Sequence, residues 1–80
     1  MPEEQLFKTE DHRSRAEIAE ALVAAAEAIE TGEVHLESAT DDQRVTVPEN
    51  PRFEVELERL TDSETGEQRY ELEYEIRWTE

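Results

Sequence analysis

Two histidines and a few neighbouring polar residues are the first candidates for chemistry in this 80-residue chain. His12 lies just before a predicted helix and His35 on the polar side of a predicted strand, so we expect no shared metal or catalytic role for them. Asp11, His12 and Ser14 are the residue types of a catalytic triad. They are neighbours in a predicted helix-capping turn, however, and Ser14 is better explained as the cap. The sequence therefore predicts no catalytic residue and a non-enzymatic protein.

Carboxylates on two predicted C-terminal strands are the second candidates, since hard divalent cations bind clustered oxygens. A flat, exposed ladder offers no backbone loop to wrap an ion, and a solvated acidic face is the favoured interpretation. Neighbours along one face stand about 6.6 Å apart, but nothing buries one of them to separate their pKa values for acid–base catalysis. We expect no metal site and no cofactor. The carboxylates are those of Glu54, Glu56, Glu58, Glu71, Glu73 and Glu75.

The charge balance restricts the partners. With 23 acidic and 8 basic side chains the net charge is -15, which repels nucleic acid and anionic membranes and attracts cations or basic proteins. The excess of Glu, and of Arg over Lys, suggests the cytoplasm of a halophile, where molar salt shortens the Debye length to about 3 Å. An acidic protein of an ordinary cell, with charge serving solubility, is the alternative.

Membrane and redox features are absent from the sequence. The longest apolar run, Ala21 to Ala26, is far shorter than a bilayer span, and Met1-Pro2-Glu3-Glu4 does not resemble the basic start of a signal peptide. Without cysteine there is no disulfide or thiol chemistry. We expect a soluble, cytoplasmic protein with no membrane contact.

A helix is predicted from about Arg15 to Glu30. Ser14 and Glu17 have the S-x-x-E spacing of a capping box at its start, and Gly32 suits its C-terminal cap. Val23 belongs to a second, weaker stripe on the flank, explained either by helix propensity or by a helix-packing surface. The main apolar stripe at helical spacing comprises Ile18, Ala21, Leu22, Ala25, Ala28 and Ile29.

Alternation with period two predicts the strands. A short strand is expected in "EQLFKTED" before the helix, and longer ones in "EVHLES", "QRVTVPE", "RFEVELERL" and "YELEYEIRWTE" after it. Asp41-Asp42 reads as the turn of a first hairpin, and the prolines at 48 and 51 mark an irregular connection. The order β-α-β-β-β-β predicts one α+β domain over residues 1–80, a mainly antiparallel sheet of four to five strands with one amphipathic helix on one face.

The alternation does not determine the register of the last hairpin. A tight turn at Thr65-Gly66 opposes Glu54 to Arg77. A longer loop opposes Arg52 to Glu75, and with it Glu58 to Arg69.

The C-terminal strand, with Tyr70, Leu72, Tyr74, Ile76 and Trp78 alternating against acidic residues, resembles the hallmark of the Amphi-Trp domain family. The resemblance continues in Leu6-Phe7 and "SRAEIAEAL" and spans nearly the whole chain. It implies the fold and the salty archaeal cytoplasm, and leaves the function open.

The apolar face of the predicted sheet is the main candidate for a contact. Five strands at about 4.8 Å give a sheet roughly 20 Å wide, whereas a helix is about 10 to 12 Å across. A strongly twisted sheet can be covered by one diagonal helix, which would leave a monomer. Otherwise the remainder binds a second copy, another protein or a small apolar ligand. We expect a homodimer with Phe53, Tyr74, Trp78 and Val23 near the contact; the alternatives are a small-ligand binder and an acidic nucleic-acid mimic.

Overall fold

The computed structural model describes residues 3–80, which form one helix and four antiparallel strands. The α+β class is thus confirmed. The chain divides into two compact units, Met1–Glu49 and Asn50–Glu80, and each is described by itself. The elements are α1 (Arg15–Thr31), β1 (Glu33–Glu37), β2 (Asp42–Thr46), β3 (Arg52–Thr61) and β4 (Gln68–Arg77).

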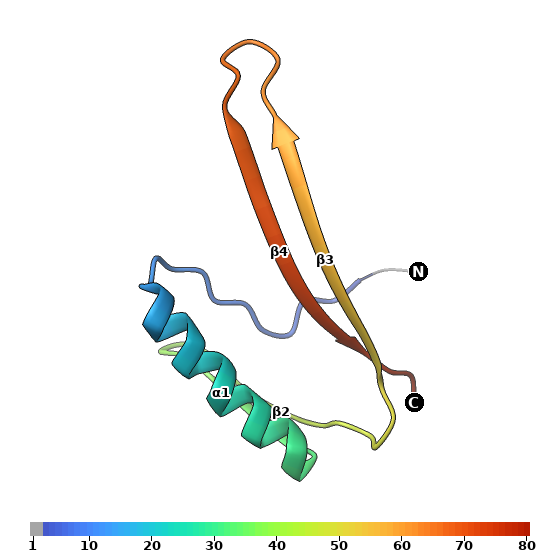
Figure 1. The fold of residues 1–80 in the computed structure, drawn as a ribbon. Coiled ribbons are helices and arrows are strands. Elements are labelled where there is room, and N and C mark those ends of the chain that lie inside the picture. Colours follow the sequence, from blue (N-terminus) through green and yellow to red (C-terminus); the bar gives the residue numbers. More distant parts are fainter. Residues whose placement is uncertain (1–2) are drawn as a thin grey trace. The chain divides into compact units, whose positions relative to one another are not determined.

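Helix α1, labelled in Figure 1, is capped at both ends by the predicted residues. The Glu17 N–H donates to the Ser14 hydroxyl and the Ser14 N–H donates to the Glu17 carboxylate, each at 3.1 Å. These bonds hold the pKa of Glu17 below its usual value. Gly32 ends the helix in the left-handed region, with φ of 88°. The predicted helix is confirmed to within one residue at its C-terminal end.

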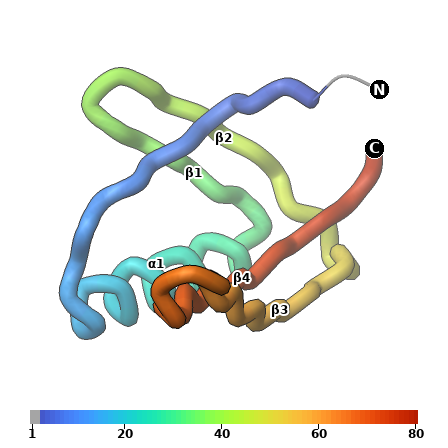
Figure 2. Tube along the Cα trace, turned by 90° about the horizontal axis from the view of Figure 1, so that it is seen from above, coloured from blue at the N-terminus to red at the C-terminus, as the bar shows by residue number. Residues whose placement is uncertain are grey.

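Strands β1 and β2 form the predicted hairpin in the same unit as α1 (Figure 2). Its loop is held by the Ser38 N–H, which donates to the Asp41 carbonyl at 2.8 Å. At the open end the Val47 N–H donates to the Gly32 carbonyl at 2.7 Å, which ties the end of α1 to the end of β2. Val47 is the one buried apolar residue among residues 3–80, with 8% of its surface exposed. The core of this unit is therefore small.

Strands β3 and β4 form a long, twisted hairpin (Figure 1). The Asp62 carboxylate accepts hydrogen bonds from the Glu64 N–H at 2.8 Å and the Thr65 N–H at 3.1 Å, and these bonds lower the pKa of Asp62. The Asp62 N–H donates to the Glu67 carbonyl, and the Gly66 N–H donates to the Asp62 carbonyl. Gly66 takes a φ of 77°, which glycine adopts without a steric penalty.

This loop closes the hairpin in a register midway between the two predicted alternatives, so both were wrong. Glu54 opposes Glu75 rather than Arg77, and Arg52 opposes Arg77. A tight turn at Thr65-Gly66 would have placed Arg77, rather than Glu75, opposite Glu54. The last ladder pair, Thr61–Gln68, instead leaves six residues, 62–67, in the connection, which is closed by the hydrogen bond from the Asp62 N–H to the Glu67 carbonyl.

Two further predictions about the sheet are not confirmed. Residues 3–14 contain no strand, because Leu6 and Phe7 are adjacent rather than alternate and would point to opposite faces. The order is therefore α-β-β-β-β. The strands also pair as two separate two-stranded sheets, β1-β2 and β3-β4, and not as one. Pro48 and Pro51 lie in the connection between β2 and β3 and supply no N–H to continue a ladder. Within its own unit, α1 contacts β1.

The capping box predicts the effect of Ser14→Ala. The substitution removes the acceptor for the Glu17 N–H, and should lower the free energy of unfolding of α1 by about 1 kcal/mol. Urea unfolding followed by far-UV circular dichroism measures this change. Ser63→Ala is the matched control, since the Ser63 hydroxyl makes no hydrogen bond within residues 3–80. Equal losses in the two variants would contradict the role of the cap.

Candidate interaction surface

One side of the β3–β4 hairpin is lined by apolar side chains, and we call it the apolar face. Its largest members expose between 53% and 67% of their surface, and nothing else in the unit Asn50–Glu80 packs on them. Toward the loop, the register continues this side with the pairs Arg59–Tyr70 and Thr61–Gln68. The apolar face consists of Phe53, Val55, Leu57, Tyr70, Leu72, Tyr74 and Ile76.

Aromatic stacking organises the open end of the apolar face. The rings of Phe53 and Tyr74 stack with their centroids 6.4 Å apart and an interplanar angle of 13°. They are diagonal neighbours, because Phe53 pairs with Ile76 and Tyr74 pairs with Val55. The two nearly parallel rings give this end an aromatic surface of the kind that anchors protein contacts.

The opposite side of the hairpin, the acidic face, carries like charges directly across the two strands. The register pairs Glu54 with Glu75, and the two remaining glutamate pairs follow toward the loop. Like charges at directly opposed positions destabilise a sheet. The three pairs are Glu54–Glu75, Glu56–Glu73 and Glu58–Glu71.

Arg77 offsets this repulsion at the open end of the hairpin. Its guanidinium donates to Glu54 Oε2 at 2.8 Å and lies 3.0 Å from Glu75 Oε1. A single cation therefore bridges two opposed carboxylates. Arg52, its direct cross-strand neighbour, forms no ion pair within the described part of the chain.

In the middle of the acidic face, neighbouring carboxylates raise the pKa of Glu56 above its usual value. A hydrogen bond with the Glu58 side chain and the charge of Glu58 raise the pKa of Glu56, and the nearby Glu73 and Glu54 add to the effect. The raised pKa shows that the carboxylates interact across the face. It does not create a catalytic pair, because this face is open to solvent.

The structure brings together two of the predicted contact residues. Phe53 and Tyr74 are the stacked pair on the apolar face. Trp78 lies one residue beyond the end of β4 and is half-buried. Val23 is exposed on α1, in the other unit.

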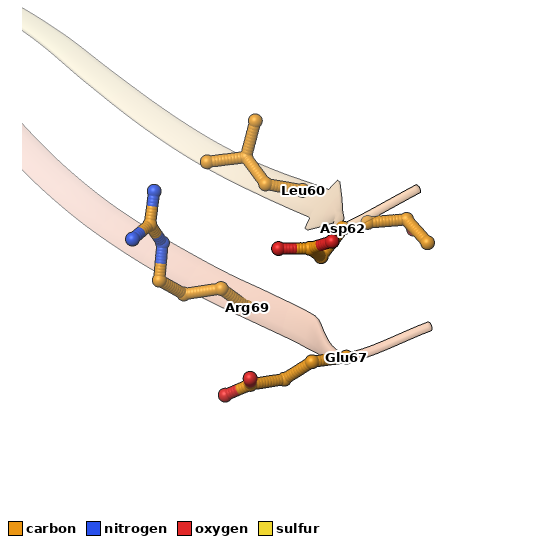
Figure 3. Close-up of a pocket in the computed structure, with 5 residues that line it drawn as sticks. Leu60, Asp62, Glu67 and Arg69 are labelled. Carbon is orange, nitrogen blue, oxygen red and sulfur yellow. The ribbon is translucent and has the colours of Figure 1, made fainter. Parts of the chain in front are cut away.

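A shallow hollow lies at the loop end of the β3–β4 hairpin (Figure 3). Leu60 and Arg69, which pair across the strands, project to the same side of the ribbon. Asp62 also lines the hollow, but its carboxylate is already occupied by the loop backbone. Four of its five lining residues are polar or charged, so the hollow suits a small apolar ligand poorly.

The two histidines have different surroundings, and no cluster of potential metal ligands within residues 3–80 includes His12. His35 lies on the polar side of β1, as predicted, with its Nε2 2.6 Å from Asp42 Oδ1. The sequence interpretation placed Asp42 in the turn and missed this contact. The contact arises because Asp42 is the first residue of β2 and opposes Glu37 directly.

Comparison with known proteins identifies one family. The model of a family described as the Amphi-Trp domain matches residues 1–80, so the resemblance seen in the C-terminal strand is confirmed over the whole chain. No curated protein and no solved structure matches. Within residues 3–80 no helix has the length and apolar character required to traverse a lipid bilayer.

The bridging position of Arg77 predicts a salt-dependent stability. Arg77→Gln leaves Glu54 and Glu75 opposed without a cation, and should destabilise the hairpin by about 0.5 kcal/mol at low salt, the range of exposed ion pairs. The loss should shrink in molar KCl, where charges are screened. Urea unfolding followed by the fluorescence of Trp78, the chain's single tryptophan, measures it.

Arg52→Gln is the matched control for Arg77→Gln, because it removes the same charge from the same end of the hairpin. It should be neutral or slightly stabilising, since Arg52 opposes another cation. A larger loss for Arg52→Gln, or a loss for Arg77→Gln that molar salt leaves unchanged, would contradict the bridging role.

Proposed function

The chain belongs to the Amphi-Trp domain family, and we propose that it is a non-enzymatic interaction module that self-associates through the apolar face of its β3–β4 hairpin. One observation carries this proposal. Six large apolar side chains on one side of a two-stranded ribbon each expose more than half of their surface. Exposed patches of this kind mark protein contacts.

A second copy supplies enough surface to make the contact stable. An isolated two-stranded hairpin is marginally stable in water, so this ribbon needs a covering layer. Its three aromatic residues, Phe53, Tyr70 and Tyr74, expose roughly 60% of their surface, together on the order of 350 Å². With a comparable area from the aliphatic residues, the face approaches the roughly 800 Å² per partner of a standard interface.

The charge distribution favours packing of the two ribbons face to face. Stacked sheets lie about 10 Å apart, and the acidic faces then point outward on opposite sides of the dimer. Their carboxylates are separated by more than the Debye length of about 8 to 10 Å at ordinary ionic strength. Pairing strand edge to strand edge would instead place the two glutamate ladders about 4.8 Å apart.

The order of residues along the apolar face is self-complementary. In an isologous dimer the two contacts across the two-fold axis are reciprocal. If residue i of one copy contacts residue j of the other, then residue j of the first copy contacts residue i of the second. An axis through the middle of the face, between Val55 and Leu57, sets Val55 of one copy over Leu57 of the other. The same operation sets Arg59 of one copy over Phe53 of the other. The guanidinium then meets the aromatic stack by a cation–π contact, and the one charge on this side of the hairpin gains a partner.

High salt fits the same arrangement. A dimer of a chain with net charge -15 doubles the acidic charge in one particle. Screening in molar salt reduces this repulsion, while excluded salts strengthen the burial of apolar surface. We therefore propose a salty cytoplasm, as in halophilic archaea, as the working environment.

Two other functions stay predictions without a structural feature in their favour. A small apolar ligand would need an apolar cavity, and the described hollow has a polar lining. A nucleic-acid mimic rests on the net charge alone. Direct binding of nucleic acid is disfavoured by the same charge.

Self-association predicts opposite results for two substitutions that change the charge equally. The wild-type chain should sediment as a dimer in molar KCl and dissociate on dilution. Leu72→Glu places a charge in the centre of the apolar face and should weaken the dimer at least about a hundredfold, as expected for an uncompensated buried charge. Arg69→Gln lowers the net charge by the same one unit but lies on the acidic face, and should leave the dimer intact. Sedimentation velocity at several concentrations measures both.

A second variant distinguishes loss of self-association from loss of folding. Tyr74→Leu keeps the face apolar but removes one ring of the stack, so it should weaken the dimer by about tenfold while circular dichroism shows the hairpin retained. A wild-type chain that stays monomeric at all concentrations and salts would overturn the proposal.

The two-fold arrangement predicts a coupling between Arg59 and Phe53. Arg59→Gln and Phe53→Leu should each weaken the dimer, and the double variant should lose less than the sum by about 0.5 to 1 kcal/mol, the size of an exposed cation–π contact. Sedimentation equilibrium on the four chains gives the coupling. Additive effects in a chain that still dimerises would reject the arrangement while leaving self-association in place.

A further inference from the structure

A cluster of three potential metal ligands lies on the polar side of the β1–β2 hairpin. His35 Nε2, Glu37 Oε2 and Asp42 Oδ1 all lie within 4.8 Å of one another. His35 Nε2 is 2.6 Å from Asp42 Oδ1 and 3.7 Å from Glu37 Oε2. Nothing in the proposed self-association uses these side chains, because they belong to the other unit.

The backbone holds the three ligands together. Glu37 and Asp42 are direct cross-strand partners, and His35 lies two residues before Glu37 on the same side of the strand. The loop between the strands is fixed by the Ser38 N–H, which donates to the Asp41 carbonyl at 2.8 Å, and by the Asp41 N–H, which donates to Ser38 Oγ at 3.0 Å. The ligands therefore sit at the tied end of a short ladder rather than on a free loop.

The donor set indicates the class of cation. An imidazole nitrogen with two carboxylate oxygens suits a borderline divalent ion such as Zn²⁺, whereas Ca²⁺ and Mg²⁺ prefer oxygen alone. Ligands bound to a tetrahedral zinc ion at about 2.1 Å are roughly 3.4 Å apart. The two distances from His35, 2.6 and 3.7 Å, lie on either side of that separation, and the carboxylate oxygens of Glu37 and Asp42 lie within 4.8 Å of each other.

The imidazole separates this cluster from the other acidic groups of the chain. The glutamates of the acidic face provide oxygen ligands only, and they follow two strands without a nitrogen donor. The competing interpretation of the cluster is an ion pair between protonated His35 and Asp42, in which a proton occupies the position of the metal. A divalent ion must displace that proton to bind.

We propose that His35, Glu37 and Asp42 form a solvent-open, three-ligand site for a zinc-type divalent cation, with water completing the coordination. The two carboxylates neutralise the charge of the ion, and the imidazole selects it over the hard cations. The site is independent of the apolar face.

Zinc titration of the full-length chain tests the proposal, because its two histidines provide an internal comparison. At mildly alkaline pH, Zn²⁺ should shift the ring resonances of His35 in long-range ¹H–¹⁵N spectra and leave those of His12 unchanged. Calorimetry should give one zinc per chain, and excess Ca²⁺ should not displace it.

Variants assign the ligands. His35→Gln should abolish the specific zinc binding, and Asp42→Asn should weaken it by about tenfold or more through loss of a charged ligand. His12→Gln is the matched control and should bind zinc like the wild type. Circular dichroism of each variant confirms that the exposed substitutions leave the fold intact.

Three results would overturn the proposal. They are equal shifts of both histidines, zinc binding that survives His35→Gln, and displacement of zinc by Ca²⁺. The first two would show adventitious binding, and the third would show that the imidazole does not select the ion.

Discussion

The loop around Asp62 sets the register of the long hairpin, and the character of both of its sides follows from that register. By accepting two backbone hydrogen bonds, the Asp62 carboxylate fixes the six-residue connection, residues 62–67, between the strands. The pairing that results opposes glutamate to glutamate on one side and apolar residue to apolar residue on the other. A register shifted by two residues in either direction would have paired some glutamates with arginines. The sheet would then have been better balanced in charge.

This register makes the β3–β4 ribbon dependent on its surroundings. On the acidic side, Arg77 compensates one glutamate pair, and in the middle of the ladder Glu58 and the nearby Glu73 and Glu54 raise the pKa of Glu56. On the apolar side, the exposed side chains stabilise the ribbon only when another surface removes them from water. Screening salt and a covering layer therefore act together. The first weakens the repulsion on one side, and the second stabilises the other.

The sequence predicted the local features well because their causes are local. Ser14 and Glu17 identify the start of α1, and Gly32 its end, since the capping bonds join residues only a few positions apart. The alternation also gave the sides of the strands correctly, and with them the apolar face that includes Phe53 and Tyr74.

The features that sequence reasoning missed depend on contacts between elements. The register of β3–β4 follows from a side chain, Asp62, that binds the backbone of its own loop, and alternation with period two cannot distinguish registers that differ by two residues. The approach of Asp42 to His35 follows from the pairing of β1 with β2, seven positions apart in sequence. The strand expected around Leu6 and Phe7 had two adjacent apolar residues and no alternation to support it.

The central claim is that a second copy of the chain covers the apolar face, and isotope-filtered NMR tests it most directly. A mixture of ¹³C-labelled and unlabelled chains in molar KCl should show intermolecular nuclear Overhauser effects between the methyl groups of Val55 and Leu57. Filtered spectra without any intermolecular effect, together with intramolecular effects from Leu57 to the methyl groups of Leu22 on α1, would show that the chain covers its own ribbon and would contradict the account.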